Sequence, residues 1–380
     1  MKSIDRESWD DPAGAFKHID LCLGCMACQT ACPSGVQYGH LLEQTRRYQR
    51  TSVQALSPFQ RLTLKWLTNR RRLGWLTALM KGIQMTGLDR LVRWLRLGPA
   101  SLRFQLAGLP KLAGPPFSQT GERRQPAAHP QGKQQGTVAL FTGCVMDHWY
   151  SDVHRATSRV LRWNGFDVVL PEDQTCCGAL HTHAGWAEEG DRLLKQNRGA
   201  FEGLDAQAIV VNAAGCGAQL GAHLWPAGGG VPIVDVSQWL FPRLILPPRQ
   251  KLPDKITYDA PCHLHHAQGV QDAPYRLLEA ACERLVPLPE AEVCCGSAGL
   301  YSIEHNQMSR QVLARKMVQI ESLAPQAVVT GNPGCQMQLQ AGLGEAGSTI
   351  RVRHTIQVLD DAYRLDNAYR RTFNLPERVS

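Results

Sequence analysis

The sequence lacks several features that define common classes of protein. Within its 380 residues, no apolar run approaches the roughly 18 residues that a membrane-spanning helix needs. The stretch Met1–Asp20 mixes charged and polar residues and has no apolar core, so we expect no secretory signal peptide. Without export we expect a cytoplasmic, reducing compartment, where thirteen cysteines are better explained by metal binding than by disulfide bonds.

Signatures of several enzyme classes are also missing. The sequence has no P-loop and no Gly-x-Ser-x-Gly motif, which argues against a nucleotide hydrolase and a serine hydrolase. The glycines at 215, 217 and 221 depart by one residue from the dinucleotide-binding fingerprint, and they coincide with a cysteine-containing turn. We therefore expect this chain to carry electrons while another subunit performs the substrate chemistry.

What the sequence does contain is a duplicated cysteine pattern. A Cys-Cys-Gly triplet occurs twice, and in each copy thirty-one residues separate it from a lone upstream cysteine. A further cysteine follows each triplet in a small-residue turn. The eight repeat cysteines are Cys144, Cys176, Cys177 and Cys216 in the first half and Cys262, Cys294, Cys295 and Cys335 in the second. Because an offset of 118 or 119 residues carries one set onto the other, the pattern indicates an internal duplication.

Each half therefore offers four thiolates to a bound group. Adjacent cysteines in an extended strand point to opposite sides, so the triplets need a sharp turn, which Gly178 and Gly296 permit. Four thiolates suit an iron–sulfur cluster or a zinc ion, and a dithiol–disulfide pair is a third option. We expect one or two iron–sulfur or zinc sites in this duplicated part.

A second cysteine motif lies near the N-terminus. Its residues are Cys22, Cys25, Cys28 and Cys32, spaced as C-x-x-C-x-x-C-x-x-x-C-P. This spacing is typical of bacterial ferredoxins and predicts a [4Fe–4S] cluster, with a zinc site as the competing interpretation. The fourth cysteine of such a run ligates the other cluster in two-cluster ferredoxins, and no second run occurs here. Three possibilities stay open: Cys32 ligates the same cluster, the fourth ligand is remote, or the site holds three irons. Cys282 belongs to neither pattern and is expected to be a small buried apolar residue.

Residues 51–112 are basic and amphipathic. They contain eleven Lys or Arg residues and one acidic residue, Asp89, although the net charge of the whole chain is only +8. Three tryptophans are interleaved, and an apolar stripe recurs at helical spacing through Leu88, Leu91, Val92 and Leu95. Such helices bind the anionic membrane surface, dock on a partner subunit, or pack on their own domain with a solvated basic face. No recognition module accompanies the charge, so we expect no nucleic-acid binding.

From residue 137 onward, predicted strands alternate with predicted helices, which indicates an α/β fold with a mainly parallel sheet. Strands are predicted at Thr137–Phe141, Phe166–Leu170, Ala208–Val211, Ile256–Asp259, Leu285–Leu288 and Ala327–Thr330, and helices at 151–164 and 186–203. Each repeat cysteine follows a predicted strand. Because sites gather at the carboxyl ends of parallel strands, we expect the cysteines to form two sites, or one site between the halves.

These observations predict five parts and an α+β chain overall. They are a small helical ferredoxin-like iron–sulfur domain over 1–50, the basic helical segment 51–112, a linker over 113–136, and two cysteine-rich α/β repeats over 137–250 and 251–380. Histidines near the cysteines are candidate ligands or proton relays, although each taken singly is more often a polar loop residue. They are His181, His183, His263, His265 and His266.

The motifs resemble those of the glycolate oxidase iron–sulfur subunit family, a cysteine-rich CCG-repeat family related to heterodisulfide reductase. The similarity covers nearly the whole chain, through the ferredoxin run followed by Pro33-Ser34-Gly35-Val36, Cys176-Cys177-Gly178-Ala179, Pro261-Cys262-His263-Leu264, Cys294-Cys295-Gly296-Ser297 and Gly334-Cys335-Gln336. The resemblance implies an electron-transfer subunit of an oxidoreductase complex, not active alone. It implies a flavoprotein partner that oxidises a 2-hydroxy acid, with electrons passing toward the membrane quinone pool or another acceptor.

Two departures from the family patterns matter. The family's first ferredoxin motif has no counterpart in this sequence. The heterodisulfide reductase pattern has a fifth cysteine in each half, where this chain has Gln219 and Gln338. A thiol–disulfide oxidoreductase subunit is the alternative function, and the missing fifth cysteines argue against it. A metal-bound scaffold or redox sensor is a third, and the intact ferredoxin run argues against that one.

Overall fold

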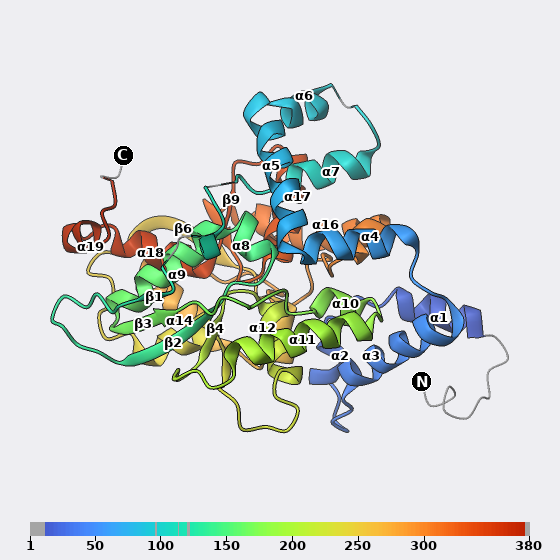
Figure 1. Ribbon diagram of the computed structural model, residues 1–380. Coiled ribbons are helices and arrows are strands. Elements are labelled where there is room, and N and C mark those ends of the chain that lie inside the picture. The colour runs from blue at the N-terminus through green and yellow to red at the C-terminus, as the bar shows by residue number, and fades with distance from the viewer. Residues whose placement is uncertain (1–11, 96, 113, 120–121, 377–380) are drawn as a thin grey trace.

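The structure is a computed structural model that describes residues 12–95, 97–112, 114–119 and 122–376 (Figure 1). The first eleven residues, on which most of the signal-peptide expectation rests, lie outside this part, as does Arg96 of the basic segment. The remainder contains two sheets. The first sheet holds β1 (Arg124–Gln125), β2 (Gly136–Phe141), β3 (Phe166–Val169), β4 (Ile209–Val211) and β5 (Ile233–Asp235). The second holds β6 (Leu252–Tyr258), β7 (Cys282–Val286), β8 (Ala327–Val329) and β9 (Arg351–Arg353).

The two sheets repeat one topology. The first has the strand order β1-β3-β2-β4-β5 and the second β7-β6-β8-β9, so β2 to β5 correspond to β6 to β9. All pairs are parallel except that of β1 with β3. The predicted α/β fold is confirmed, and the repeated strand order agrees with an internal duplication. The antiparallel β1 comes from the segment predicted as a linker, where Phe117 and Gln125 are buried.

Helices connect the strands and cover both sheets. In the first half they are α8 (Val145–Trp149), α9 (Ser151–Trp163), α10 (Ala179–His183), α11 (Ala187–Phe201), α12 (Ala214–His223), α13 (Val236–Leu240) and the 3₁₀ turn Phe241–Arg243. In the second they are the π-helix His263–Ala267, α14 (Asp272–Ala281), α15 (Tyr301–Glu304), α16 (Asn306–Leu323), α17 (Pro333–Glu345), α18 (Thr355–Tyr363) and α19 (Asn367–Thr372). Helix α9 ends where predicted, because Gly165 takes a φ of +92° there.

Strand boundaries differ from prediction at β6, which starts four residues early at Leu252, and at β7. The apolar run suggested a strand over 285–288, whereas the observed strand begins at Cys282 and ends at Val286. Pro287 has no amide hydrogen to donate, so the ladder ends before it. The short strands β5 (Ile-Val-Asp) and β9 (Arg-Val-Arg) escaped prediction because charged residues interrupt their apolar runs, unlike those of β4 and β8.

The two halves share a buried contact behind the sheets. Helix α9 packs on α18, where Arg159 lies 2.6 Å from Asp360, and the hydroxyl of Tyr369 donates to the same carboxylate at 2.7 Å. These groups are nearly buried, so the charges are paired and satisfied. The contact fixes how the two cysteine-bearing edges face each other.

The N-terminal part is helical. It contains α1 (Pro12–Asp20), α2 (Ala27–Thr30), α3 (Tyr38–Tyr48), the π-helix Gln49–Val53, α4 (Pro58–Thr68), α5 (Arg70–Thr86), α6 (Leu88–Trp94) and α7 (Ala100–Gly108); the 3₁₀ turn Phe117–Gln119 follows. Ser57 caps α4 with a capping box, and Asn69 caps α5. Helices α5 to α7 project from the body of the molecule as a lobe, which we call the helical lobe (residues 70–108, Figure 1).

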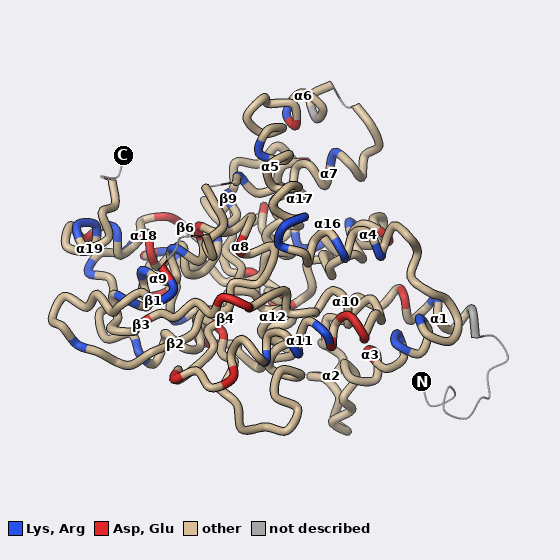
Figure 2. The backbone as a smooth tube through the Cα atoms, in the orientation of Figure 1, with Lys and Arg blue, Asp and Glu red and all other residues tan. Residues whose placement is uncertain are grey.

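The apolar stripe of α6 is only partly covered by its own domain. Leu88, Leu91 and Leu95 are 46%, 45% and 48% exposed, and Trp75 and Trp94 are 75% and 78% exposed. Acidic side chains are scarce along the helical lobe, and basic ones are spread over it (Figure 2). Packing on its own domain, one of the three possibilities that the sequence left for this segment, thus leaves apolar side chains of α6 uncovered.

None of the helices in the described part of the chain combines the length and the apolar character that crossing a bilayer requires.

Candidate iron–sulfur site

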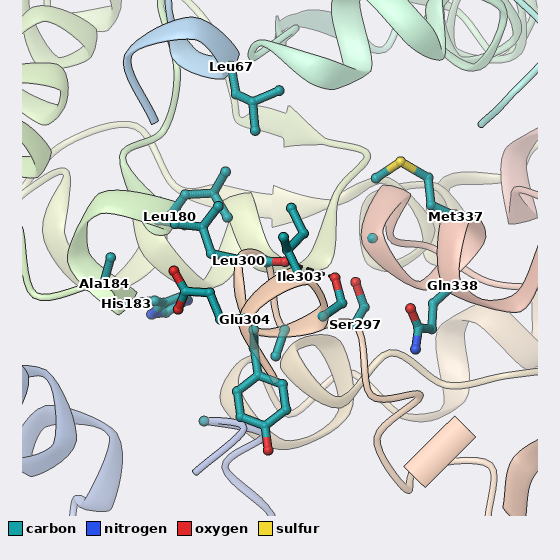
Figure 3. A pocket seen from close by; sticks show the side chains of 18 of the residues that line it. Leu67, Leu180, His183, Ala184, Ser297, Leu300, Ile303, Glu304, Met337 and Gln338 are labelled. Atoms are coloured by element: carbon teal, nitrogen blue, oxygen red, sulfur yellow. Dashed lines mark hydrogen bonds between the residues drawn. The ribbon is translucent and has the colours of Figure 1, made fainter. Parts of the chain in front are cut away.

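Both sets of repeat cysteines open onto one cavity of about 1030 Å³. The cysteines that line it are Cys22, Cys144, Cys176, Cys177, Cys216, Cys262, Cys294, Cys295 and Cys335. The repeat cysteines reach it because each follows a parallel strand, and the carboxyl ends of both sheets face this space. The expected convergence at the strand ends is confirmed, as a single space between the halves. Figure 3 shows other side chains that surround it.

In the first half, the cysteines lie in two close pairs. The sulfurs of Cys144 and Cys176 are 3.6 Å apart, and those of Cys177 and Cys216 are 3.2 Å apart. Gly178 takes a φ of +87°, which lets its amide approach the Cys176 sulfur at 3.5 Å. The neighbouring Cys176 sulfur, together with burial, raises the pKa of the Cys144 thiol.

Asn197 of α11 holds the first Cys-Cys-Gly turn through two hydrogen bonds. Its side-chain oxygen accepts from the Thr175 amide at 2.8 Å, and its amide group donates to the Cys176 carbonyl at 2.9 Å. Because Asn197 is fully buried, these bonds hold the first Cys-Cys-Gly turn in one orientation.

The second half repeats the turn with different support. Gly296 has a φ of +85° and directs its amide to the Cys294 sulfur at 3.4 Å. A Cβ atom at Gly296 would collide with the Ser309 carbonyl oxygen, so only glycine fits. Contacts with Cys262 and Cys295 lower the pKa of the Cys294 thiol. Among Cys262, Cys294 and Cys295, the thiolate form is therefore favoured at Cys294. The thiolate is the form that binds iron or zinc.

The last cysteine of each half lies in the first turn of a helix. The sequence suggested small-residue turns at Cys216 and Cys335, whereas these residues belong to α12 and α17. Ala and Gly form compact first turns, and Pro333 at the start of α17 has a φ already suited to a helix. The two helix starts meet between the halves, where the Gly215 amide approaches the Asn332 side-chain oxygen at 3.3 Å.

The N-terminal motif lies against the second half. Helix α2 contacts the π-helix that follows Cys262, and the His266 ring lies 3.1 Å from the Thr30 hydroxyl. The Tyr38 hydroxyl and the Gly24 amide approach the Cys22 sulfur at 3.6 Å and 3.4 Å. Burial raises the pKa of the Cys25 thiol, and charges on Cys22, Cys28 and Cys294 act on it in the same direction.

Two cysteines stand apart from these groups. Backbone amides of Val36 and Ser34 lower the pKa of the Cys32 thiol, which is held by its own exposed loop. Cys282 is buried in β7, and its thiol donates to the Leu278 carbonyl at 2.9 Å. It lies outside the cavity lining, as expected for a small apolar residue.

Of the five candidate histidines, His183 and His263 line the cavity, with ring centres 5.4 Å apart. Burial lowers the pKa of His183 to about 3, so the ring is neutral. His181 packs on Trp186 with ring centres 5.5 Å apart, and His265 and His266 contact each other outside the lining.

Sequence reasoning missed an acidic group beside them. Glu43 of α3 lies 3.4 Å from the His223 ring and 3.9 Å from the His183 ring, joining the N-terminal part to the first half. Arg46, one turn later, donates to the carbonyls of Cys22 and His183. Neither position belongs to a recognisable motif, so only the fold reveals them.

The donor set of thiols fits an iron–sulfur group. Among the described residues, no three cysteine, histidine or carboxylate side chains come close enough to enclose one metal ion. Thiols instead surround a wide cavity, with backbone amides directed at Cys22, Cys176 and Cys294. Amide hydrogen bonds to sulfur are the means by which proteins tune such clusters.

Comparison with known proteins agrees with this geometry. The cysteine-rich domain family matches residues 138–221 and 256–340, one match in each half. The chain is 34% identical to the probable glycolate oxidase iron–sulfur subunit of Bacillus subtilis (strain 168), over 93% of this chain and 84% of that protein. The chain belongs to the glycolate oxidase iron–sulfur subunit family. The resemblance seen in the sequence is therefore confirmed.

Two further relatives are similar to the chain. The glycolate oxidase iron–sulfur subunit of Escherichia coli (strain K12) is 30% identical over 91% of this chain and 82% of its own length. Lactate utilization protein A of Geobacillus kaustophilus (strain HTA426) is 32% identical over 59% of this chain and 98% of its own length. Iron–sulfur binding and a subunit role in an oxidoreductase are thus properties of the family to which the chain belongs.

Proposed function

We propose that this chain is the iron–sulfur electron-transfer subunit of a flavin-dependent 2-hydroxy acid dehydrogenase complex of the glycolate type. It acts in the cytoplasm and is inactive alone. It receives electrons from a flavoprotein subunit and passes them toward a quinone or another acceptor. The observation that carries the proposal is the convergence of Cys22 and all eight repeat cysteines on one cavity. Electron transfer through a series of closely placed redox groups requires that their cysteine ligands converge in this way.

The proposal assigns a role to each cysteine motif. Cys22, Cys25 and Cys28 hold a [4Fe–4S] cluster in a ferredoxin-like domain over 1–50, with Cys32 or a remote group as the fourth ligand. The repeats over 137–250 and 251–380 hold one or two further iron–sulfur groups, for which zinc is the competing metal. Contact of the N-terminal loop with the second half supports a route between these sites.

The glutamines at the fifth-cysteine positions favour this function over thiol–disulfide chemistry. Gln219 donates to the Thr182 hydroxyl at 3.0 Å, and Gln338 donates to the Ser309 hydroxyl at 2.9 Å. Thr182 and Ser309 each lie on a helix that follows a Cys-Cys-Gly turn. In both halves the heterodisulfide reductase pattern has a cysteine at this position. This chain has instead a buried glutamine that is held by a hydrogen bond.

The function is tested by electron paramagnetic resonance on the complex isolated anaerobically with its flavoprotein. Adding glycolate, and then lactate, is expected to produce reduced iron–sulfur signals, because the flavoprotein passes on the electrons of the hydroxy acid. The isolated chain should respond to dithionite but to neither acid. If dithionite produces the signals in the complex but neither hydroxy acid does, the proposal is rejected and a disulfide substrate is favoured.

The helical lobe supplies the contact that we propose with the cytoplasmic face of the membrane. It presents exposed Trp and Leu side chains among basic ones, the composition of helices that lie on anionic lipid. Its base is fixed to the body, where the Trp149 indole donates to Thr77 at 3.0 Å. The projecting α6 is therefore held in position to meet a flat surface.

Removing charge from the helical lobe should weaken lipid binding. Because each basic residue near an anionic surface contributes about 1 kcal/mol, Arg71→Gln with Arg72→Gln should weaken binding to phosphatidylserine vesicles roughly 30-fold. Co-sedimentation with vesicles measures the effect, which should shrink at high salt. Arg249→Gln, at a side chain 86% exposed elsewhere, is the control and should change nothing. Unchanged vesicle binding with loss of the flavoprotein would instead make the helical lobe a subunit interface.

A further inference from the structure

The cavity has an apolar side that the cysteines do not occupy. Leu67 of α4, Leu180 of α10, Leu300 and Ile303 point into the same space from three separate parts of the chain (Figure 3). Met337 of α17 closes it from the opposite side. At about 1030 Å³, the whole cavity is as large as sites that enclose small organic molecules, which span about 300–1,000 Å³. The cysteines line other parts of the cavity, so the apolar part remains for a ligand.

The cavity opens beside the exposed face of α4. Phe59 lines the cavity although its side chain is 58% exposed, and Ile303 lines it at 41% exposure. The same helix exposes Leu62 and Trp66. An apolar surface therefore continues from the outside of the molecule into the cavity, on the helix that precedes the helical lobe.

The cationic side chains of the lining are already engaged. Arg46 donates to the carbonyls of Ile19, Cys22 and His183, and Arg50 pairs with Asp20 and donates to Ala184. No other Lys or Arg lines the cavity in the described part of the chain. An anionic ligand, such as a charged disulfide, would find no free cation there. The lining instead suits a neutral molecule with an apolar body and a few polar atoms.

Polar groups are placed to meet such atoms. Ser297, Glu304 and Gln338 line the same space as the apolar side chains (Figure 3), and His305 lines it as well. Ser297 packs on the start of α17, since a Cβ at Gly334 would lie 2.8 Å from its hydroxyl oxygen. A ring bound against Leu67 and Ile303 would share the cavity with the cysteines.

We propose that the apolar half of this cavity binds the neutral quinone-type acceptor of the complex, which enters from the lipid surface beside α4. This inference rests on the proposed function, which supplies the electrons. Oxidation of one hydroxy acid to the 2-oxo acid releases two electrons and two protons at the flavoprotein. The quinone takes up two electrons through this chain and two protons from water beside Glu304 and His305 of the lining, and leaves as the quinol.

Filling the apolar half should block the acceptor and leave the metal sites intact. Leu67→Trp and, separately, Ile303→Trp are made in the complete complex, and a decyl-substituted benzoquinone is the probe. Each should weaken quinone binding in equilibrium dialysis, and slow the oxidation of hydroxy-acid-reduced signals by quinone, about tenfold or more. Reduction of ferricyanide should be unchanged, because this hydrophilic acceptor takes electrons at the surface. Leu41→Trp, at an exposed leucine of α3, is the matched control.

The outcomes separate this inference from the proposed function. Quinone binding that is unaltered in both cavity variants would overturn the inference and reserve the cavity for the metal groups. Ile303 is already partly exposed, so its variant should fold even if Leu67→Trp does not. If hydroxy acids fail to reduce the unaltered complex, the proposed function is wrong, but dialysis of the quinone still tests the cavity.

Discussion

Replacing Cys295 with serine is expected to remove the metal group of the second half and to stop electron transfer through it. The sulfur lies in the cavity wall, 3% exposed, beside Cys294 and Cys335. A serine oxygen is a poor substitute for a thiolate at iron, and even changes to residues that only orient ligands cost about 10–100-fold in metal affinity or activity. We expect hydroxy-acid-dependent quinone reduction to fall at least about 100-fold.

The chain offers a matched control in Cys282. It is also 3% exposed, but it lies in β7 outside the cavity, and serine can keep its hydrogen bond to the Leu278 carbonyl. Cys282→Ser should retain iron, sulfide and the reduced signals, whereas Cys295→Ser loses one set of them. Metal analysis also reports zinc, so loss of zinc alone from Cys295→Ser would assign zinc to the second half. If both variants retain the same amount of metal, Cys295 is not a metal ligand.

The sequence reveals the repeat because cysteine spacing is a local, discrete signal. Offsets of 118 and 119 residues between the two sets predicted equivalent folds, and the strands β2 and β8 lie within a residue of their predicted positions. Apolar runs of three or more residues bounded by Gly or Pro suffice for this. Placement of the cysteines after strands, combined with the behaviour of parallel sheets, was enough to predict their convergence.

The other features of the site and of the helical lobe depend on tertiary contacts that sequence patterns do not encode. Glu43 and His223 meet across 180 residues of chain, and neither stands in a motif. The stripe of α6 has the periodicity of a core helix, yet its leucines face outward, because periodicity reports an apolar face and not what covers it. The apolar half of the cavity likewise combines α4, α10 and α17, which only tertiary structure brings together.

The second large effect is expected from a buried ion pair near the second Cys-Cys-Gly turn. Lys316 of α16 is 2% exposed and lies 2.5 Å from Asp259, which is 1% exposed. The lysine also donates to the Ala291 carbonyl at 2.9 Å, and Thr330 donates to the far oxygen of Asp259 at 3.0 Å. Although burial disfavours the charge, Asp259 raises the pKa of Lys316. The pair fixes α16 to the strand end that leads to Cys262.

Lys316→Met should lower the free energy of unfolding by about 3–5 kcal/mol, because it leaves the buried Asp259 carboxylate without its cation. Adding Asp259→Asn to this variant removes the charge and should recover most of the loss, since a neutral pair needs no counter-ion. Arg315→Met, one residue earlier, breaks the exposed pair with Glu290 and should cost less than about 1 kcal/mol. Urea unfolding under anaerobic conditions measures all three variants. Equal losses for Lys316→Met and Arg315→Met would mean that water reaches Asp259 and that the turn is held by Ser309 and Gly296 without the ion pair.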